Sequence, residues 1–211
     1  MKTAEQILKK VKATELLYGK NKELEKIRKI ITKTKKEEEI FHKRFFWDYE
    51  SSRWDIAINK EIRNFIKQQL KVKGRILDFG AGSFCYIKKS IACDLSFLML
   101  KKNKVKLKVL YHFHDKPLPF RDKSFDNVLL IFVVDYIDNV DLLLREIKRI
   151  LKKDGKVVVV QSKTQGIYNK IKQKQITKQQ LEKIMQKHFK VISFTKKFQK
   201  KSFDFIVGEK V

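Results

Sequence analysis

The sequence is poor in cysteine and proline, and it has no long hydrophobic run. Its two cysteines, Cys85 and Cys93, match neither a zinc-ligand spacing nor a disulfide framework, so we expect two buried thiols and no metal site. No apolar run approaches the roughly 20 residues that a membrane-spanning helix needs. The first residues are charged and amphipathic, without the apolar stretch of a signal peptide, so we predict a cytoplasmic protein with no membrane span.

Acidic residues are also scarce. Of 211 residues, 50 are Lys or Arg and only 24 are Asp or Glu, which gives a formal net charge of +26. Residues 151–211 carry 16 basic and 4 acidic side chains, nearly half of the excess. A field of this size attracts polyanions, and RNA is the partner that we favour. The alternative is compositional bias, since 42 of the 50 basic residues are Lys, as in AT-rich genomes, although such bias does not explain so few Asp and Glu.

The first 45 residues are predicted to form a helical extension. Apolar residues recur at helical spacing on both sides of Gly19, which indicates two helices, or one interrupted helix, ending near Phe46. Six aromatic residues then follow closely in residues 41–54. This cluster either packs against the following domain or serves as a lid over a ligand or a platform for a stacked base.

After a further helix expected at residues 55–71, short strands alternate with helices. This order predicts a mostly parallel sheet with helices on both faces, closed by an antiparallel pair of strands. Strands are expected at residues 75–79, 91–94, within 105–113, and at 125–131, 157–160, 190–196 and 202–210. Helices are expected at residues 96–103, 139–151 and 177–188, together with a short helix of about seven residues ending at Lys89.

The segment Arg-Ile-Leu-Asp-Phe-Gly-Ala-Gly at residues 75–82 carries the strongest functional signal. Gly80 and Gly82 follow a strand, and glycine lets the backbone N–H groups approach a ligand closely because it has no Cβ. Asp78 suits a cationic or hydroxyl-bearing ligand, and the segment lacks the Gly-Lys-Ser/Thr of a phosphate-binding loop. Asp94, at the end of the next strand, is placed to accept hydrogen bonds from ribose hydroxyls.

In this order, the motifs resemble the class I S-adenosylmethionine-dependent methyltransferases, type 11-like, over roughly residues 46–211. The resemblance is carried by the segments ILDFGAGS (76–83), CDLS (93–96), HDKPLPFRDKSFDNVLLIFVVDYI (114–137) and LLREIKRILKKDGKVVVV (143–160). It implies a Rossmann-like α/β three-layer sandwich, with a mostly parallel seven-stranded sheet and an antiparallel C-terminal strand. The implied domains are the N-terminal helical extension, residues 1–45, and the S-adenosylmethionine-binding domain, residues 46–211.

The resemblance also implies which residues bind the cofactor, S-adenosylmethionine. Its methionine portion would lie against Asp78, Gly80, Ala81 and Gly82, with the carboxylate near the cofactor's amino group. Phe132 would lie beside the cofactor, near the methyl donor.

The ribose and adenine portions involve a second group of residues. The resemblance implies that Asp94 holds the ribose hydroxyls and that Leu95 lies beside the adenine. His114 and Asp115 would flank the adenine, and Asp115 would accept from its amino group.

The acceptor side departs from the family pattern. Asp135 and Tyr136 stand where related enzymes often have two histidines, and they are our candidates for the catalytic residues. Asp135 would be a general base, the alternative being a helix N-cap, for which Asp138 and Asn139 compete. Phe84 replaces the third glycine of the usual loop, at the position that often lets the helix pack close to the strand.

The predicted function is therefore an S-adenosylmethionine-dependent methyltransferase (EC 2.1.1.-), acting on tRNA or rRNA that the Lys-rich C-terminal third and the helical extension bind. One alternative is a methyltransferase for a small molecule or lipid-like metabolite, with the aromatic cluster as its lid. A further alternative is a catalytically inactive methyltransferase fold that binds a partner. The methylated atom and the oligomeric state are open at this stage.

Overall fold

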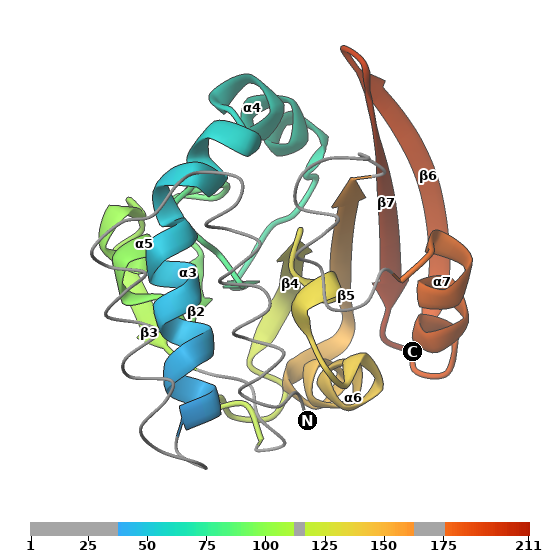
Figure 1. Cartoon of the computed structure of the whole chain (residues 1–211). Coiled ribbons are helices and arrows are strands. Elements are labelled where there is room, and N and C mark those ends of the chain that lie inside the picture. The colour runs from blue at the N-terminus through green and yellow to red at the C-terminus, as the bar shows by residue number, and fades with distance from the viewer. Residues whose placement is uncertain (1–37, 112–116, 163–175) are drawn as a thin grey trace.

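A seven-stranded sheet forms the centre of the computed structural model, which describes residues 38–111, 117–162 and 176–211 (Figure 1). The strand order is β3-β2-β1-β4-β5-β7-β6. Neighbours from β3 to β5 in this order pair in parallel, whereas β7 pairs antiparallel with β5 and β6. The strands are β1 (Ile76–Phe79), β2 (Ile91–Asp94), β3 (Leu107–Leu110), β4 (Phe125–Ile131), β5 (Leu151–Ser162), β6 (Lys190–Phe198) and β7 (Lys201–Glu209).

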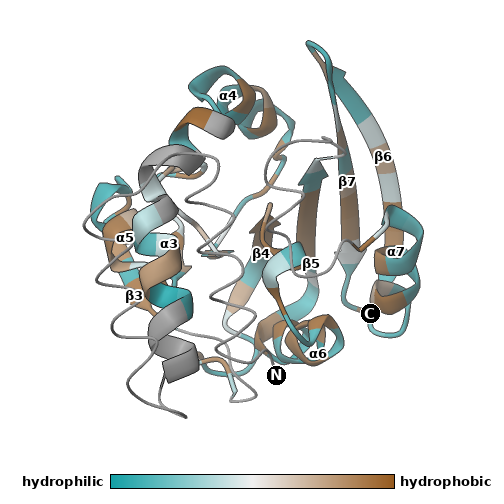
Figure 2. Cartoon of the chain, viewed as in Figure 1, coloured by the Kyte–Doolittle hydropathy of each residue, from teal (hydrophilic) through white to brown (hydrophobic). Residues whose placement is uncertain are grey.

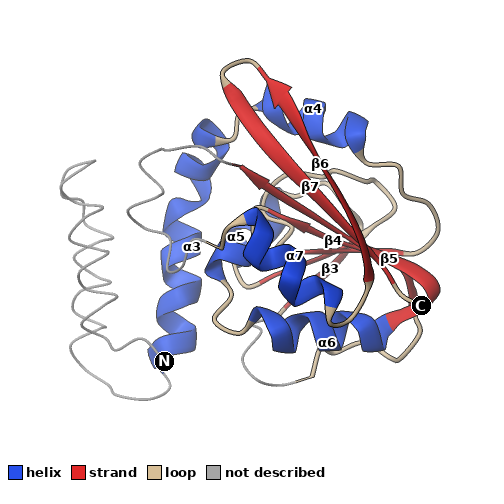
Figure 3. Ribbon diagram, turned by 90° about the vertical axis from the view of Figure 1, so that its right-hand side faces the viewer, coloured by secondary structure: helices blue, strands red, loops and turns tan. Residues whose placement is uncertain are grey.

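Helices cover both faces of this sheet (Figure 3). They are α3 (Glu38–Ala57), α4 (Lys60–Gln69), α5 (Phe97–Lys102), α6 (Val140–Ile150), α7 (Lys178–Gln186) and the single 3₁₀ turn η1 (Val134–Tyr136). Ile66 of α4 packs in one buried cluster with Leu129, while Ile147 of α6 packs in another with Val128. Because successive strand residues point to opposite faces, α4 and α6 lie on opposite sides of β4. The predicted Rossmann-like three-layer sandwich is confirmed.

Side-chain caps explain where several helices begin. Asn59, Ser96, Asn139 and Thr177 each accept a hydrogen bond from a backbone N–H in the first turn of the helix that follows. Such caps satisfy donors that have no partner within the helix. Asn139 is therefore the N-cap of α6, and Asp135 and Asp138 do not hold this position.

The expected short helix ending at Lys89 is absent, and this prediction was wrong. Residues 81–90, between β1 and β2, form turns and bends. Phe84 and Tyr86 both pack into the cluster beneath α4, with their rings edge to face at 4.8 Å. Residues two positions apart point to nearly opposite sides of a helix, so an extended segment satisfies this packing and a helix does not.

The N-terminal helix also differs from the prediction. A helix is expected to end near Phe46, but α3 continues past this residue without interruption, from Glu38 to Ala57. The helix expected at 55–71 begins only at Lys60, after the Asn59 cap. The predicted domain boundary between residues 45 and 46 falls inside α3, and the other helices predicted in residues 1–37 lie outside the described residues.

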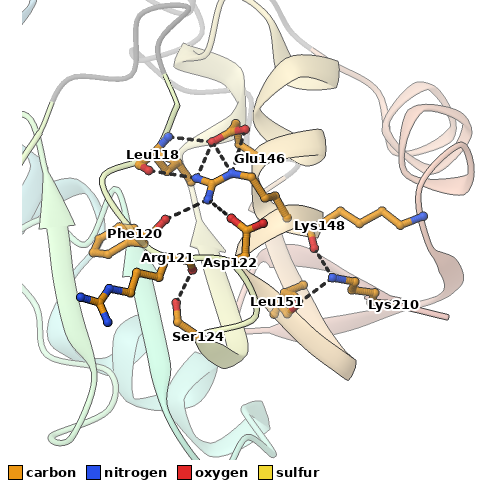
Figure 4. Close-up of polar contacts among 10 residues, drawn as sticks. Leu118, Phe120, Arg121, Asp122, Ser124, Glu146, Lys148, Leu151 and Lys210 are labelled. Atoms are coloured by element: carbon orange, nitrogen blue, oxygen red, sulfur yellow. Dashed lines mark hydrogen bonds and ion pairs between the residues drawn. The ribbon is translucent and has the colours of Figure 1, made fainter.

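Arg149 of α6 fixes the Leu118-Pro119-Phe120 turn that leads into β4. Figure 4 labels its partners Leu118, Phe120, Asp122 and Glu146. Its guanidinium donates to the carbonyl oxygens of Leu118 and Phe120 at 3.0 and 2.9 Å and pairs with Asp122 at 2.6 Å. Glu146 pairs with the same guanidinium at 2.8 Å and accepts from the Leu118 N–H at 2.8 Å. The Leu-Pro-Phe motif and the charged residues of α6 therefore form one structural unit.

Within the part of the chain that the structure describes, no helix combines the length and the apolar character needed to cross a membrane.

Candidate functional site

The predicted cofactor residues gather where parallel strands end. Asp78 on β1 is in register with Ala92 on β2 and with Leu129 on β4, so the carboxyl ends of these three strands meet at one edge of the sheet. Seven predicted cofactor residues lie at this edge: Asp78, Gly80, Ala81, Gly82, Asp94, Leu95 and Phe132. His114 and Asp115 lie outside the described residues, so their predicted contacts with adenine stay predictions.

Asp78 is a buried carboxyl group, and one of its two oxygen atoms has no hydrogen-bond partner among the described residues. Its side chain is 1% exposed, and Oδ1 has no hydrogen bond within the described residues. Burial, together with the nearby charge of Asp94, raises the pKa of Asp78 to about 8. An unpaired carboxylate in such a place costs several kcal/mol unless a cation joins it. The geometry therefore fits a ligand that brings a positively charged, hydrogen-bonding group to Oδ1.

Asp94 is buried as well, but both of its oxygen atoms accept hydrogen bonds. Oδ2 accepts from the Gly82 N–H at 2.8 Å, and Oδ1 accepts from the Ser96 N–H at 2.8 Å. Burial raises the pKa of Asp94 to about 6, and the backbone hydrogen bonds from Ser96 and Gly82 oppose this rise. A carboxylate oxygen has more than one lone pair, so Asp94 can accept further bonds from a neighbouring diol.

The glycine loop needs glycine at position 80 for two separate reasons. Gly80 has φ of +69°, and a Cβ at this position would lie 2.4 Å from Cγ2 of Val133. The N–H groups of Gly80 and Ala81 donate to the carbonyl oxygen of Cys93 at 2.8 and 3.2 Å. The loop is thus held against the end of β2, beside Asp94.

Side chains on α3 and α4, and one directly after α5, hold the rest of this loop in place. Asp55 of α3 accepts from the Ser83 hydroxyl and from Nη2 of Arg63, the latter at 2.9 Å. Buried Asn103, directly after α5, donates through Nδ2 to the carbonyl oxygens of Gly82 and Phe84, at 3.0 and 3.1 Å. These bonds satisfy polar groups that the absent helix would otherwise have satisfied.

Phe84 therefore does not obstruct the loop. The third glycine of the family pattern permits a helix to pack closely, and this chain has no helix there. The Phe84 ring instead packs below the Arg63 guanidinium, whose carbon lies 5.3 Å from the ring centre. Phe84 does depart from the family pattern, and the fold accommodates it because no helix follows Gly82.

Helix α3 contacts all three loops of the site. Asp48 accepts from the Ser96 hydroxyl at 2.5 Å and from the Leu98 N–H at 2.9 Å, at the start of α5. Trp47 meets Tyr136 edge to face at 4.6 Å, after β4. Asp55 reaches the glycine loop at the other end of the helix. Trp47 of the aromatic cluster therefore packs against the following domain, at the segment predicted to face the methyl acceptor.

Asp135 and Tyr136 occupy η1, next to the carboxyl end of β4. Asp135 is 8% exposed, and its Oδ1 accepts from the Ile176 N–H at 3.3 Å. This bond gives Asp135 a structural role, and its role as a base stays a prediction. Phe132, just before η1, has φ of +58°, a strained conformation for a residue other than glycine, and such strain is concentrated at functional sites.

Sequence reasoning missed the residues that hold the site from outside. These are Asp48, Asp55, Arg63 and Asn103. A signal was present, because Asp48, Ser51 and Asp55 recur at helical spacing within the aromatic segment and therefore lie on one face of α3. Asn103 gave no such signal, since a lone asparagine after a short helix is common.

Comparison with known proteins gives a family match for the central part of the chain. Residues 74–159 match a family model described as a methyltransferase domain. An uncharacterised protein of Methanocaldococcus jannaschii is 34% identical over 91 residues, which cover 41% of this chain and 44% of that protein. The chain spans less than half the length of the three Methanocaldococcus jannaschii proteins that it matches.

The solved structures that share the fold include two methyltransferases. One is a S-adenosylmethionine-dependent methyltransferase of Thermotoga maritima, described as a possible histamine N-methyltransferase, with a TM-score of 0.60 and 22% identity over 77% of this chain and 95% of that one. The other is phosphoethanolamine N-methyltransferase 2 of Haemonchus contortus in complex with S-adenosylmethionine. Its TM-score is 0.57, with 16% identity over 77% of this chain and 57% of that one.

Proposed function

We propose that this chain, a member of the class I S-adenosylmethionine-dependent methyltransferase superfamily, transfers a methyl group from S-adenosylmethionine to RNA. The observation that carries the cofactor assignment is the buried, unpartnered Oδ1 of Asp78. The cofactor has a positively charged amino group of the kind that this atom requires. Asp94, at the end of the adjacent strand, accepts from the ribose hydroxyls.

Methyl transfer makes modest chemical demands on the protein. S-adenosylmethionine supplies a methyl group on a sulfonium, which an in-line nucleophile displaces while the bonding electron pair stays on sulfur. The protein must align the acceptor, and alignment alone supplies several kcal/mol. A proton lost by the acceptor goes to a base or to solvent, and Asp135 in η1, after β4, is our candidate for that base.

The charge distribution supports RNA as the acceptor. Nearly half of the net charge of +26 lies in residues 151–211, which form β5, α7, β6 and β7 in the described part of the chain. An excess of this kind provides affinity for a phosphate backbone and leaves the choice of atom to the site.

A small-molecule acceptor is the second candidate. Trp47 of α3 packs against Tyr136 beside the acceptor side, and an aromatic helix in this position can exclude water from an enclosed ligand. Of the two methyltransferases that share the fold, one is named for phosphoethanolamine and the other is described as a possible histamine N-methyltransferase, and both of these acceptors are small amines.

Methyl labelling separates these functions. The purified protein, with S-adenosylmethionine that carries a labelled methyl group, is incubated with total RNA and with small-metabolite extract from a strain that lacks the protein. We expect label in RNA and none with the Asp94→Ala variant. Label in the metabolite fraction alone would establish the second candidate. No cofactor binding by calorimetry would exclude both methyltransferases and leave the binding protein.

Cofactor affinity should depend on pH. We expect it to increase about 20-fold between pH 6 and pH 7.5, because the positively charged cofactor favours ionised Asp78, whose pKa is about 8 in the free protein. In this range a proton must leave Asp78 when the cofactor binds. Calorimetry in two buffers with different ionisation enthalpies counts that proton. An affinity that stays constant or decreases with pH would rule out the contact between Asp78 and the cofactor's amino group.

A further inference from the structure

The β6–β7 hairpin projects past the rest of the sheet on the side where the parallel strands have their carboxyl ends and where the candidate site lies. The last residue of β5, Ser162, is in register with Phe203, and the hairpin continues beyond this pair through Lys197↔Ser202 and Phe198↔Lys201 to its turn. Figure 1 shows the hairpin extending above the tip of the β5 arrow. We call residues 196–201 the hairpin tip.

The hairpin tip carries an unbalanced positive charge. Four of its six residues are lysines, namely Lys196, Lys197, Lys200 and Lys201. The first three are exposed, and none of these three forms an ion pair with a described residue. By contrast, the exposed Lys156 on β5 pairs with Glu209 at 3.1 Å. Figure 2 shows the tip as hydrophilic, in contrast to the apolar middle of β7.

Aromatic contacts join this tip to the methyl-transfer site. Phe198 of the tip stacks on Phe65 of α4 with ring centres 4.7 Å apart, and Phe65 lies 5.9 Å from Phe203. Phe203 in turn lies 6.1 Å from Phe132, the residue predicted to be near the methyl donor. Gln199 also donates to Glu61 of α4 at 2.8 Å. The tip is therefore a braced projection and not a free loop.

We propose that the hairpin tip binds the phosphate backbone of the RNA acceptor and holds it beside the methyl donor. This inference rests on the proposed function. Lys196 and Lys201 share one face of the ribbon with Phe198, whereas Lys197 lies on the other face. Cations on both faces suit a flexible strand that passes around the ribbon, whereas a bilayer meets only one face. Phe198 is already packed, so the tip has no apolar residue to insert into lipid.

The test compares two variants that remove the same charge. The first is the tip variant, Lys196→Gln/Lys197→Gln/Lys200→Gln. The control is Lys104→Gln/Lys106→Gln/Lys108→Gln, on and just before β3. In the strand order, β3 is the edge strand at the far end of the sheet from β6. All six lysines are exposed. Affinity for labelled bulk tRNA is measured over a series of salt concentrations, and cofactor affinity is measured by calorimetry.

We expect the tip variant to bind tRNA at least about tenfold more weakly, with a salt slope lower by about 2 for three lost phosphate contacts, while the control changes less than threefold. Cofactor affinity should be unchanged in both variants. Equal losses in the two variants, or no loss in either, would overturn the tip assignment even if the wild type methylates RNA. Wild-type protein that binds anionic phosphatidylserine vesicles and no tRNA would overturn it as well. Labelling of metabolites and not of RNA would instead refute the proposed acceptor.

Discussion

The Asp78→Asn variant should lose cofactor affinity by about 100-fold while the free protein becomes more stable. The amide has nearly the same shape as the carboxyl group, so the loop and the strand remain in place. The loss follows because a charge-assisted hydrogen bond to a buried group is worth roughly 2–5 kcal/mol. The gain follows because the wild-type carboxyl group, 1% exposed in the core, must either keep a proton at neutral pH or carry an unpaired charge, and the amide does neither.

The stability gain has a predictable dependence on pH. Folding raises the pKa of Asp78 from 3.8 to about 8, so the folded state holds a proton that the unfolded state releases. Below pH 3.8 both states are protonated and Asp78 costs nothing. As the pH rises towards 8, the wild-type protein loses stability, up to several kcal/mol, and above that pH the loss is complete. The variant should lack this contribution.

Denaturation at a series of pH values, without cofactor, measures the stability, and calorimetry measures the affinity. Asp154→Asn is the matched control, because Asp154 is exposed and its φ of +59° suits asparagine as well as aspartate. We expect the control to change neither quantity. If Asp78→Asn binds the cofactor as tightly as the wild type, the carboxylate does not hold the amino group, and another residue must do so.

The predicted cofactor residues at the carboxyl ends of the strands could be found from the sequence because the patterns that identify them are short and local. Asp78, Gly80 and Gly82 follow an apolar strand directly, and the carboxyl ends of parallel strands meet, so Asp94 had to lie nearby. The start of α7 was also readable from Thr177, which forms a capping box with Gln180. In each case, a short stretch of sequence contains all the partners that determine the structure.

The supports of the glycine loop were not predictable because their partners are far apart in sequence. Asp48 and Ser96 are separated by 48 residues, and Asp55 and Ser83 by 28. The alternation of strands and helices also led to the wrong expectation of a helix after Gly82. The physical reason for its absence is the inward packing of Phe84 and Tyr86 against α4, which depends on a tertiary surface.

The Asp55→Ala variant should lose both stability and cofactor affinity. It leaves the guanidinium of Arg63, 8% exposed, without its carboxylate. Breaking a fully buried pair costs about 3–5 kcal/mol, and because Asp55 itself is 34% exposed we expect about 2 kcal/mol here. The Ser83 hydroxyl loses its acceptor at the same time, so we expect cofactor affinity to fall about tenfold as the glycine loop loosens.

The double variant Asp55→Ala/Arg63→Met distinguishes the two effects. Removing the guanidinium removes the unpaired charge, and methionine can cover the Phe84 ring as the Arg63 stem does, so stability should return to near the wild-type value. Cofactor affinity should stay low, because Ser83 still lacks its acceptor. Asp138→Ala is the control, since it breaks the Lys43–Asp138 pair of α3 at a half-exposed carboxylate and should cost less than about 1 kcal/mol. A double variant that regains both properties would mean that Asp55 acts through stability alone. A double variant that regains only stability would show that α3 positions the cofactor loop directly. In that case α3 supports the segment between β1 and β2, where no helix forms.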